Sequence, residues 1–179
     1  MRRTDKRYQS TRHYGMPKIL PRHIVAALAR VEPLSLMKGE AFADSIFASQ
    51  PNLLASVLVL PRFGVSNKDL DVVLKLLFIC FESVLESGAK LPIITEEIQD
   101  RCLARMAGKS KFIEGLSASA TSQAVWDQVA SHLEPNLLAL CFDILRENDL
   151  ASVRTEAEKH LVLASLNIVD SIAYALNDA

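Results

Sequence analysis

Asp69-Leu-Asp-Val-Val-Leu-Lys-Leu-Leu-Phe-Ile-Cys-Phe-Glu-Ser-Val-Leu-Glu-Ser87 is the most apolar stretch of this 179-residue chain. Asp71, Lys75 and Glu82 are four and seven positions apart, which places them on one narrow stripe of a helix. Glu86 continues that stripe. The rest of the helix surface is almost entirely Leu, Val, Ile, Phe or Cys, so other elements must cover it on nearly every side. The sequence therefore predicts a buried helix over residues 66–87.

Both ends of this helix carry recognisable signals. Ser66 with Asp69 three residues later resembles a capping box, and Gly88 is a typical C-terminal stop. Lys75 and Glu82 interrupt the apolar run, which falls far short of the roughly 20 residues that a bilayer requires. The stretch is therefore expected to be the centre of a helical bundle, and no membrane contact is expected.

The composition indicates a globular all-α protein. Half of the residues are hydrophobic, whereas Gly and Pro number only six and seven. Alternation of the kind found in strands is scarce, while Leu and Ala are abundant. We expect a single helical bundle of about eight helices over residues 17–179, preceded by a flexible basic arm over residues 1–16.

Pro, Gly and capping residues delimit the other helices. They are expected over residues 21–31, 35–49, 52–60, 95–107, 121–133, 136–147 and 152–177. In the second of these, Phe42, Ile46 and Phe47 are expected to point inward. Thr155 with Glu158 forms a second capping-box pattern, just inside the start of the last helix.

The pentapeptide Pro-Asn-Leu-Leu-Ala occurs twice, at residues 51–55 and 135–139. Each copy follows an amphipathic helix, opens a short helix and leads through a break into a long apolar helix. Residues 42–87 and 125–177 therefore read as two versions of one three-helix unit, although shared capping chemistry would also explain five identical residues. If the duplication holds, the two long helices are equivalent and pack together at the centre of the bundle.

The net charge of −1 conceals a basic start and an acidic remainder. Residues 1–22 hold a single acid and seven basic residues, so this segment carries +6 and the rest of the chain −7. The basic residues are Arg2, Arg3, Lys6, Arg7, Arg12, Lys18 and Arg22. Such a segment is suited to contacting nucleic acid without sequence specificity or to docking on an acidic protein surface, and a solubilising tail has the same composition.

Three widely spaced cysteines, Cys80, Cys102 and Cys141, do not form a disulfide framework or a Cys-x-x-Cys site. Reduced thiols packed in a core fit a cytoplasmic protein. The N-terminus lacks the apolar core of a signal peptide. Its Arg-rich composition also fits a mitochondrial transit peptide, against which Asp5 and the two following prolines argue.

No catalytic or cofactor-binding motif is present, and we expect neither a cofactor nor a metal. Among the six glycines, those at 64, 88, 108 and 115 are isolated, and no Gly-rich phosphate-binding loop is present in the sequence. Glu156 and His160 share one face of the last helix, where a carboxylate and an imidazole can bind a metal or transfer a proton. A solvated helix surface is the simpler interpretation of this single pair.

Arg62 and Phe63 lie in a short connection between two helices. Arg and Phe are enriched at the centres of protein interfaces, so this pair is a candidate partner-binding site, while Phe63 can also turn back into the core. The leading hypothesis is a non-enzymatic protein-interaction module such as an adaptor, immunity-type or regulatory bundle. The alternatives are an accessory nucleic-acid-binding protein acting through its basic arm and a helical-bundle enzyme using Glu156 and His160. So apolar a chain also allows a homodimer.

Overall fold

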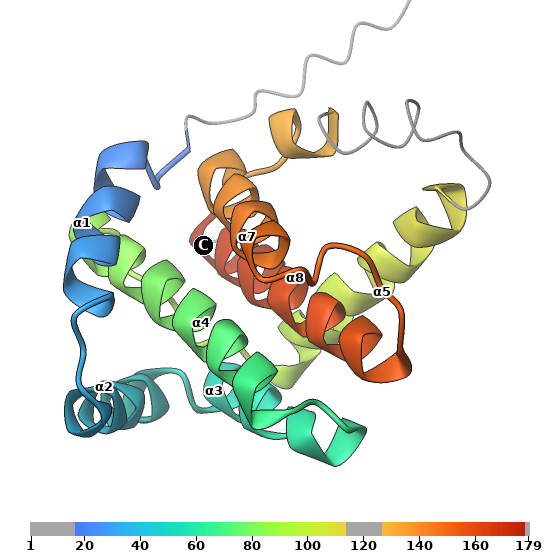
Figure 1. The fold of residues 1–179 in the computed structure, drawn as a ribbon. Helices are drawn as coiled ribbons and strands as arrows, with labels where there is room; N and C mark the ends of the chain where they lie inside the picture. The colour runs from blue at the N-terminus through green and yellow to red at the C-terminus, as the bar shows by residue number, and fades with distance from the viewer. Residues whose placement is uncertain (1–16, 114–126, 178–179) are drawn as a thin grey trace, which may run out of the picture.

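The computed structural model describes residues 17–113 and 127–177, and these residues form helices and no strand, which confirms the all-α class (Figure 1). No helix in these ranges is long and apolar enough to cross a membrane. The elements are α1 (Pro21–Val31), α2 (Leu36–Ser49), α3 (Pro51–Leu58), the 3-10 helix η1 (Leu60–Phe63), α4 (Asn67–Ser87), α5 (Glu96–Ile113), α7 (Pro135–Glu147) and α8 (Glu156–Asn177).

The predicted central helix is confirmed as α4. The hydroxyl of Ser66 accepts the backbone N–H of Asp69 at 3.2 Å, and Gly88 ends the helix with a φ of 71°. Other helices pack around α4: α1, α2, α3, α7 and α8 all contact it. Figure 1 shows α4 and α8 side by side and running in the same direction. One exception to the burial is Leu85, whose exposed fraction is 53%.

The polar stripe of α4 faces the C-terminal part of α1. The guanidinium of Arg30 donates to the carboxylate of Glu82 at 2.6 Å and also pairs with Glu86. Farther toward the start of α4, the ammonium of Lys75 lies 3.7 Å from the carboxylate of Glu32. Glu82 is buried, and Arg30 supplies the partner that a buried carboxylate requires.

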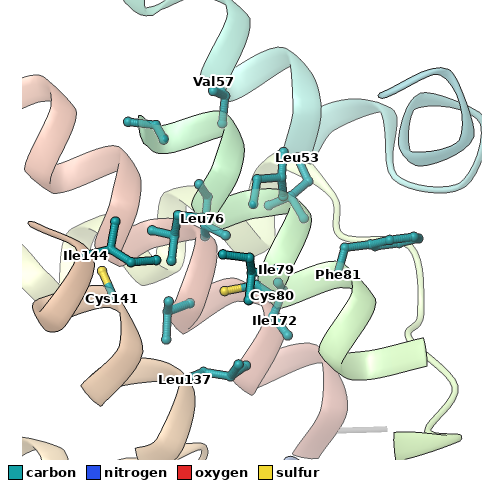
Figure 2. Close-up of a cluster of buried hydrophobic side chains, with 14 of the residues drawn as sticks. Leu53, Val57, Leu76, Ile79, Cys80, Phe81, Leu137, Cys141, Ile144 and Ile172 are labelled. Carbon is teal, nitrogen blue, oxygen red and sulfur yellow. The ribbon is translucent and has the colours of Figure 1, made fainter. Parts of the chain in front are cut away.

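The core lies where α3, α4, α7 and α8 meet. Figure 2 shows side chains from these four helices converging, among them Leu53, Leu76, Leu137 and Ile172. All four are fully buried. Each helix therefore contributes its apolar face to one continuous cluster.

One inward prediction for α2 is wrong. Ile46 is fully buried, and Phe42 packs edge-on against Phe78 with ring centroids 5.1 Å apart. Phe47, however, has an exposed fraction of 56%. Consecutive helical residues are rotated by about 100°, so Phe47 turns away from the face that Phe42 and Ile46 share.

Several element boundaries also differ from those expected. The connection after α3 contains η1, so the chain stays helical through Pro61. Helix α5 continues past Gly108 to Ile113, because a glycine weakens a helix by about 1 kcal/mol without necessarily ending it. The helix expected over 121–133 is described only from residue 127 and is helical to residue 130.

The last helix begins at Glu156 rather than near residue 152. Thr155 and Glu158 form the predicted capping box, which lies at the start of the helix instead of inside it. The hydroxyl of Thr155 accepts the N–H of Glu158 at 3.1 Å, and the carboxylate of Glu158 accepts the N–H of Thr155 at 3.0 Å.

Candidate functional site

The turn that carries Arg62 and Phe63 is fixed at both ends. Leu60 and Val65 are buried, and the N–H of Val65 donates to the carbonyl of Leu60 at 3.4 Å. Gly64 takes a left-handed conformation with a φ of 83°, which reverses the chain. Because the flanking residues are anchored in the core, Arg62 and Phe63 are exposed on a short, internally hydrogen-bonded turn.

Phe63 leans on α8. Its ring and the imidazole of His160 have centroids 4.7 Å apart and planes 32° apart. The exposed fraction of Phe63 is 49%, so the side chain is neither tucked into the core nor fully free. We call Arg62, Phe63 and His160 the Phe63 surface. Sequence reasoning singled out Phe63 and His160 for unrelated reasons, and the fold brings them together.

In the described part of the chain, Glu156 and His160 form no hydrogen bond or ion pair with each other. Its carboxylate pairs with the ammonium of Lys159 at 3.4 Å, while His160 has Phe63 as its neighbour. Within residues 17–113 and 127–177, no group of three or more His, Cys, Asp or Glu is placed to hold a metal ion. The pair proposed for acid–base or metal chemistry is thus not assembled in this arrangement.

The three thiols are free and fully buried, as the sequence predicts. Burial raises the pKa of Cys80 to about 12 and raises the pKa of Cys141 well above its usual value. The sulfur of Cys102 accepts a hydrogen bond from Arg105 at 3.0 Å, whereas the adjacent Arg101 donates to the hydroxyl of Tyr174. At neutral pH, Cys80 and Cys141 are therefore protonated and act as packing groups.

Two of the basic residues assigned to the N-terminal segment lie in the described part of the chain. The backbone N–H of Lys18 donates to Glu134 at 3.0 Å, and its ammonium donates to the carbonyl of Leu176. The guanidinium of Arg22, on α1, lies 3.2 Å from the imidazole of His23. The remaining five, Arg2, Arg3, Lys6, Arg7 and Arg12, lie outside the described residues.

The residue before the first Pro-Asn-Leu-Leu-Ala copy holds the segment that leads into α5. The carbonyl oxygen of the buried Gln50 side chain accepts the N–H of Ile94 at 2.9 Å, and its amide nitrogen donates to the carbonyl of Pro92 at 3.0 Å. The amide of Asn52 donates to the carbonyl of Ile94 at 3.2 Å. We call this set the Gln50 clamp.

The residue before the second copy makes the corresponding contacts with the segment that leads into α1. The carboxylate of Glu134 accepts the N–H of Ile19 at 3.0 Å, and the amide of Asn136 donates to the carbonyl of Ile19 at 2.8 Å. Asn177, at the end of α8, also donates to Glu134. We call this set the Glu134 clamp, and both clamped isoleucines are fully buried.

Sequence reasoning missed both clamps and a buried pair beside the second. A usable signal existed, because an amide or carboxylate side chain of equal length precedes each Pro-Asn-Leu-Leu-Ala copy. His132 accepts the N–H of Glu134 through Nδ1 at 3.1 Å, and its Nε2 lies 2.9 Å from the carboxylate of Asp170. Both ring nitrogens are occupied, so this imidazole holds the turn before α7.

The Phe63 surface thus offers an aromatic face, a guanidinium and an imidazole from two elements that the core fixes relative to each other. These groups are suited to binding a partner. Comparison with protein families, with curated proteins and with solved structures finds no match for this chain.

Proposed function

We propose that the protein is a non-enzymatic protein-interaction module that binds its partner through the Phe63 surface. The observation that carries the proposal is a half-exposed Phe63 on a turn whose two ends are buried. Aromatic residues and Arg dominate the binding energy of protein interfaces. Arg62 has no ion pair with another described residue, so its guanidinium is available to a carboxylate on a partner.

The rigidity of the turn favours binding. A side chain that is already ordered loses little conformational freedom when a partner covers it, which improves affinity. Phe63 is ordered by its contact with His160, and Arg62 is adjacent on the same 3-10 turn. An aromatic contact of this kind contributes about 0.5–1.5 kcal/mol, enough to bias the ring toward one position.

The test is an affinity purification from the native host, followed by a binding measurement with the protein that co-purifies. The variant Arg62→Ala/Phe63→Ala is expected to raise the Kd by about thirtyfold or more, because truncating a hot-spot residue costs about 2 kcal/mol or more. The matched control is Lys38→Ala/Phe47→Ala on α2, which removes an exposed base and a similarly exposed Phe that do not belong to the Phe63 surface.

The control separates a local effect from general loss of exposed apolar area. Equal affinities for the two double variants would remove the Phe63 surface from the proposal, provided that both unfold at the same temperature as the parent. Each purification is repeated with nuclease. Recovery of nucleic acid alone, lost on deletion of residues 1–16, would favour the accessory nucleic-acid-binding alternative instead.

We place the protein in the cytoplasm in this proposal. Three buried free thiols are stable in a reducing compartment, whereas extracellular proteins use cysteines mainly in disulfides. A homodimer joined through the Phe63 surface is the special case in which the partner is a second copy. Sedimentation of the purified protein over a range of concentrations distinguishes the two cases.

We also propose that the chain is an internal duplication, as expected for residues 42–87 and 125–177, and that each unit extends toward the N-terminus, to residue 19 in the first and to residue 94 in the second. The Gln50 and Glu134 clamps support this by making equivalent hydrogen bonds with equivalent isoleucines. Each clamp holds the start of the other unit, so the two units are joined reciprocally. The contact between the long helices α4 and α8 fits the central pair expected of two such units.

Positions 75 residues apart in the first helix of each unit support the same interpretation. Ala27 in α1 and Cys102 in α5 are both fully buried. Arg30 in α1 contacts Glu82 near the end of α4, and Arg105 in α5 lies over the ring of Tyr174 near the end of α8, 5.0 Å from its centroid. The first unit has an ion pair at this place and the second has a cation–π contact, but both join the first helix of the unit to the end of its long helix.

A further inference from the structure

A groove on the molecule lies between α1, α4 and α7 and has a volume of about 490 Å³. Its apolar lining includes Val72 and Ile79 from α4 and Ile144 from α7. A second groove of about 400 Å³ lies beside it, between the end of α1, α2, α3 and α4, and the pair formed by Lys75 and Glu32 lines both. The first groove can therefore accept a few side chains of a bound segment, some of them apolar.

The charged residues of this groove are strongly unbalanced. Four carboxylates line it against one ammonium. The acids are Glu32, Asp71, Asp143 and Glu147, and the base is Lys75. Lys75 lies 3.7 Å from Glu32, and Asp143 pairs with Arg146 at 2.8 Å. Asp71 and Glu147 form no ion pair with another described residue and are exposed.

We propose that residues 1–16 of this same chain bind in the acidic groove. This segment holds five basic residues and one acid, the opposite of the groove. Opposite charges at such a surface attract over about 8–10 Å at physiological salt, so the segment is drawn to the groove before it makes contact. Tyr8, Tyr14 and Met16 supply apolar area for the floor.

The chain is long enough to reach. The groove begins beside Leu28, seven residues after the start of α1, which is about 10 Å along a helix. Sixteen residues span up to roughly 50 Å when extended. The Glu134 clamp fixes residues 18 and 19, so the segment starts from a defined point at the N-terminal end of α1.

The charges favour this occupant over the folded part of a second copy. Beyond residue 22 the chain carries −7, so another body would bring more negative charge to a negative groove. Within residues 17–22, Lys18 and Arg22 are already engaged with Leu176 and His23. Residues 1–16 therefore hold the other five charges of the basic segment, and these are the ones that the acidic groove would attract.

The experiment uses the full chain with Ser10→Cys carrying a nitroxide label, attached under native conditions in which the three natural thiols are buried. Paramagnetic broadening of backbone amides is measured by NMR at about 20 mM and about 500 mM salt. We expect broadening at Val72, Leu140 and Ile144 at low salt and its loss at high salt. The variant Asp71→Asn/Glu147→Gln should reduce the broadening roughly two- to tenfold, as expected for two lost exposed charges.

The matched control is Glu96→Gln/Asp100→Asn on α5, which makes the same change of charge on exposed residues outside the groove. It should leave the broadening unchanged. The proposal is overturned if the groove amides are not broadened at low salt, or if both double variants behave alike. It is also overturned if broadening appears only between differently isotope-labelled copies in a mixture, which would mean that the segment binds another molecule.

Discussion

Gly64 and Gly39 place opposite demands on the backbone. Gly64 has a φ of 83°, and a Cβ added there would lie 3.8 Å from Ala157, so the conformation and not the space requires glycine. Gly39 lies inside α2, where an added Cβ would meet nothing within 4 Å. We predict that Gly64→Ala lowers the free energy of unfolding by about 1–2 kcal/mol, whereas Gly39→Ala raises it by about 0.5–1 kcal/mol.

Urea unfolding at equilibrium measures both changes. Effects of the same sign would contradict the assigned backbone conformations. Gly64→Ala is also expected to raise the Kd for the partner in the binding measurement, because the turn that carries Phe63 depends on this residue.

The choice of Gln at position 50 and Glu at position 134 follows from what each side chain meets. Gln50 faces the N–H of Ile94 and the carbonyl of Pro92, so it needs a donor and an acceptor. Glu134 faces the N–H groups of Lys18 and Ile19, so it needs two acceptors. We predict that Gln50→Glu and Glu134→Gln each lower the free energy of unfolding by about 1–3 kcal/mol, the cost of a buried mismatched group.

Chemical denaturation measures the free energy of unfolding of both clamp variants. Glu96→Gln, on the exposed surface of α5, is the control for a Glu-to-Gln change. Stability unchanged in both clamp variants would mean that water replaces the lost partners. The sequence marks the two pentapeptides and the Gln or Glu before each, but it does not mark the segments that these side chains hold, because a hydrogen-bond partner more than 40 positions away leaves no local pattern.

At the level of elements, the start of α8 depends on ionised Glu158. Its pKa is lowered, first by its hydrogen bond with Arg154 and then by the backbone N–H groups of residues 154 and 155. A carboxylate whose folded pKa is depressed stabilises the fold above its ordinary value of 4.5, and this contribution is lost as the pH falls through the folded value.

We predict that Glu158→Gln unfolds at a lower temperature than the parent at pH 7 and that the difference shrinks as the pH falls below 4.5. Thermal unfolding followed by circular dichroism at several pH values measures this. A difference that is independent of pH would show that the carboxylate charge does not contribute.

Sequence reasoning located elements well where a local signal defines them. Pro21, Ser66, Gly88 and Pro135 mark helix ends that the structure confirms within a residue, because capping and proline chemistry act over one turn. It failed where the surroundings decide. Phe47 is apolar but exposed, since the helix rotates it away from the shared face of α2.

The polar stripe of α4 contains the converse case, an acidic residue that the structure buries. Glu82 is an acidic residue and yet buried, with Arg30 of α1 as its partner. Likewise the surface around Phe63 combines residues nearly one hundred positions apart. Each of them was visible in the sequence, but their proximity depends on how η1 packs on α8.

For the whole molecule, the thiols report on whether the core is closed. Cys80, Cys102 and Cys141 are fully buried, and burial raises the pKa of Cys80 to about 12. Because the thiolate is the reactive form, we predict that a thiol reagent at pH 8 modifies none of them within the time in which it modifies all three in denaturant. Rapid reaction of one thiol in the native protein would identify a helix that opens locally.

The reciprocal clamps make a stronger prediction about the whole chain. Gln50 holds the start of the second unit, and Glu134 holds the start of the first, while α4 and α8 share the core. A chain cut between Ala89 and Lys90, at an inserted protease site, should therefore remain one particle in gel filtration. Its fragments should separate in urea at a lower concentration than unfolds the uncut chain, because the cut chain loses the covalent connection that limits the entropy of dissociation.

The clamp variants provide the control for this experiment. In the cut chain, Glu134→Gln should lower the urea concentration at which the fragments separate, since it weakens a contact between fragments rather than within one. The exposed change Glu96→Gln should not. Fragments that separate in native buffer would show that the covalent connection at residues 88–95 holds the two units together. The Gln50 and Glu134 clamps would then be too weak to join them, which would contradict the proposed reciprocal contact between the units.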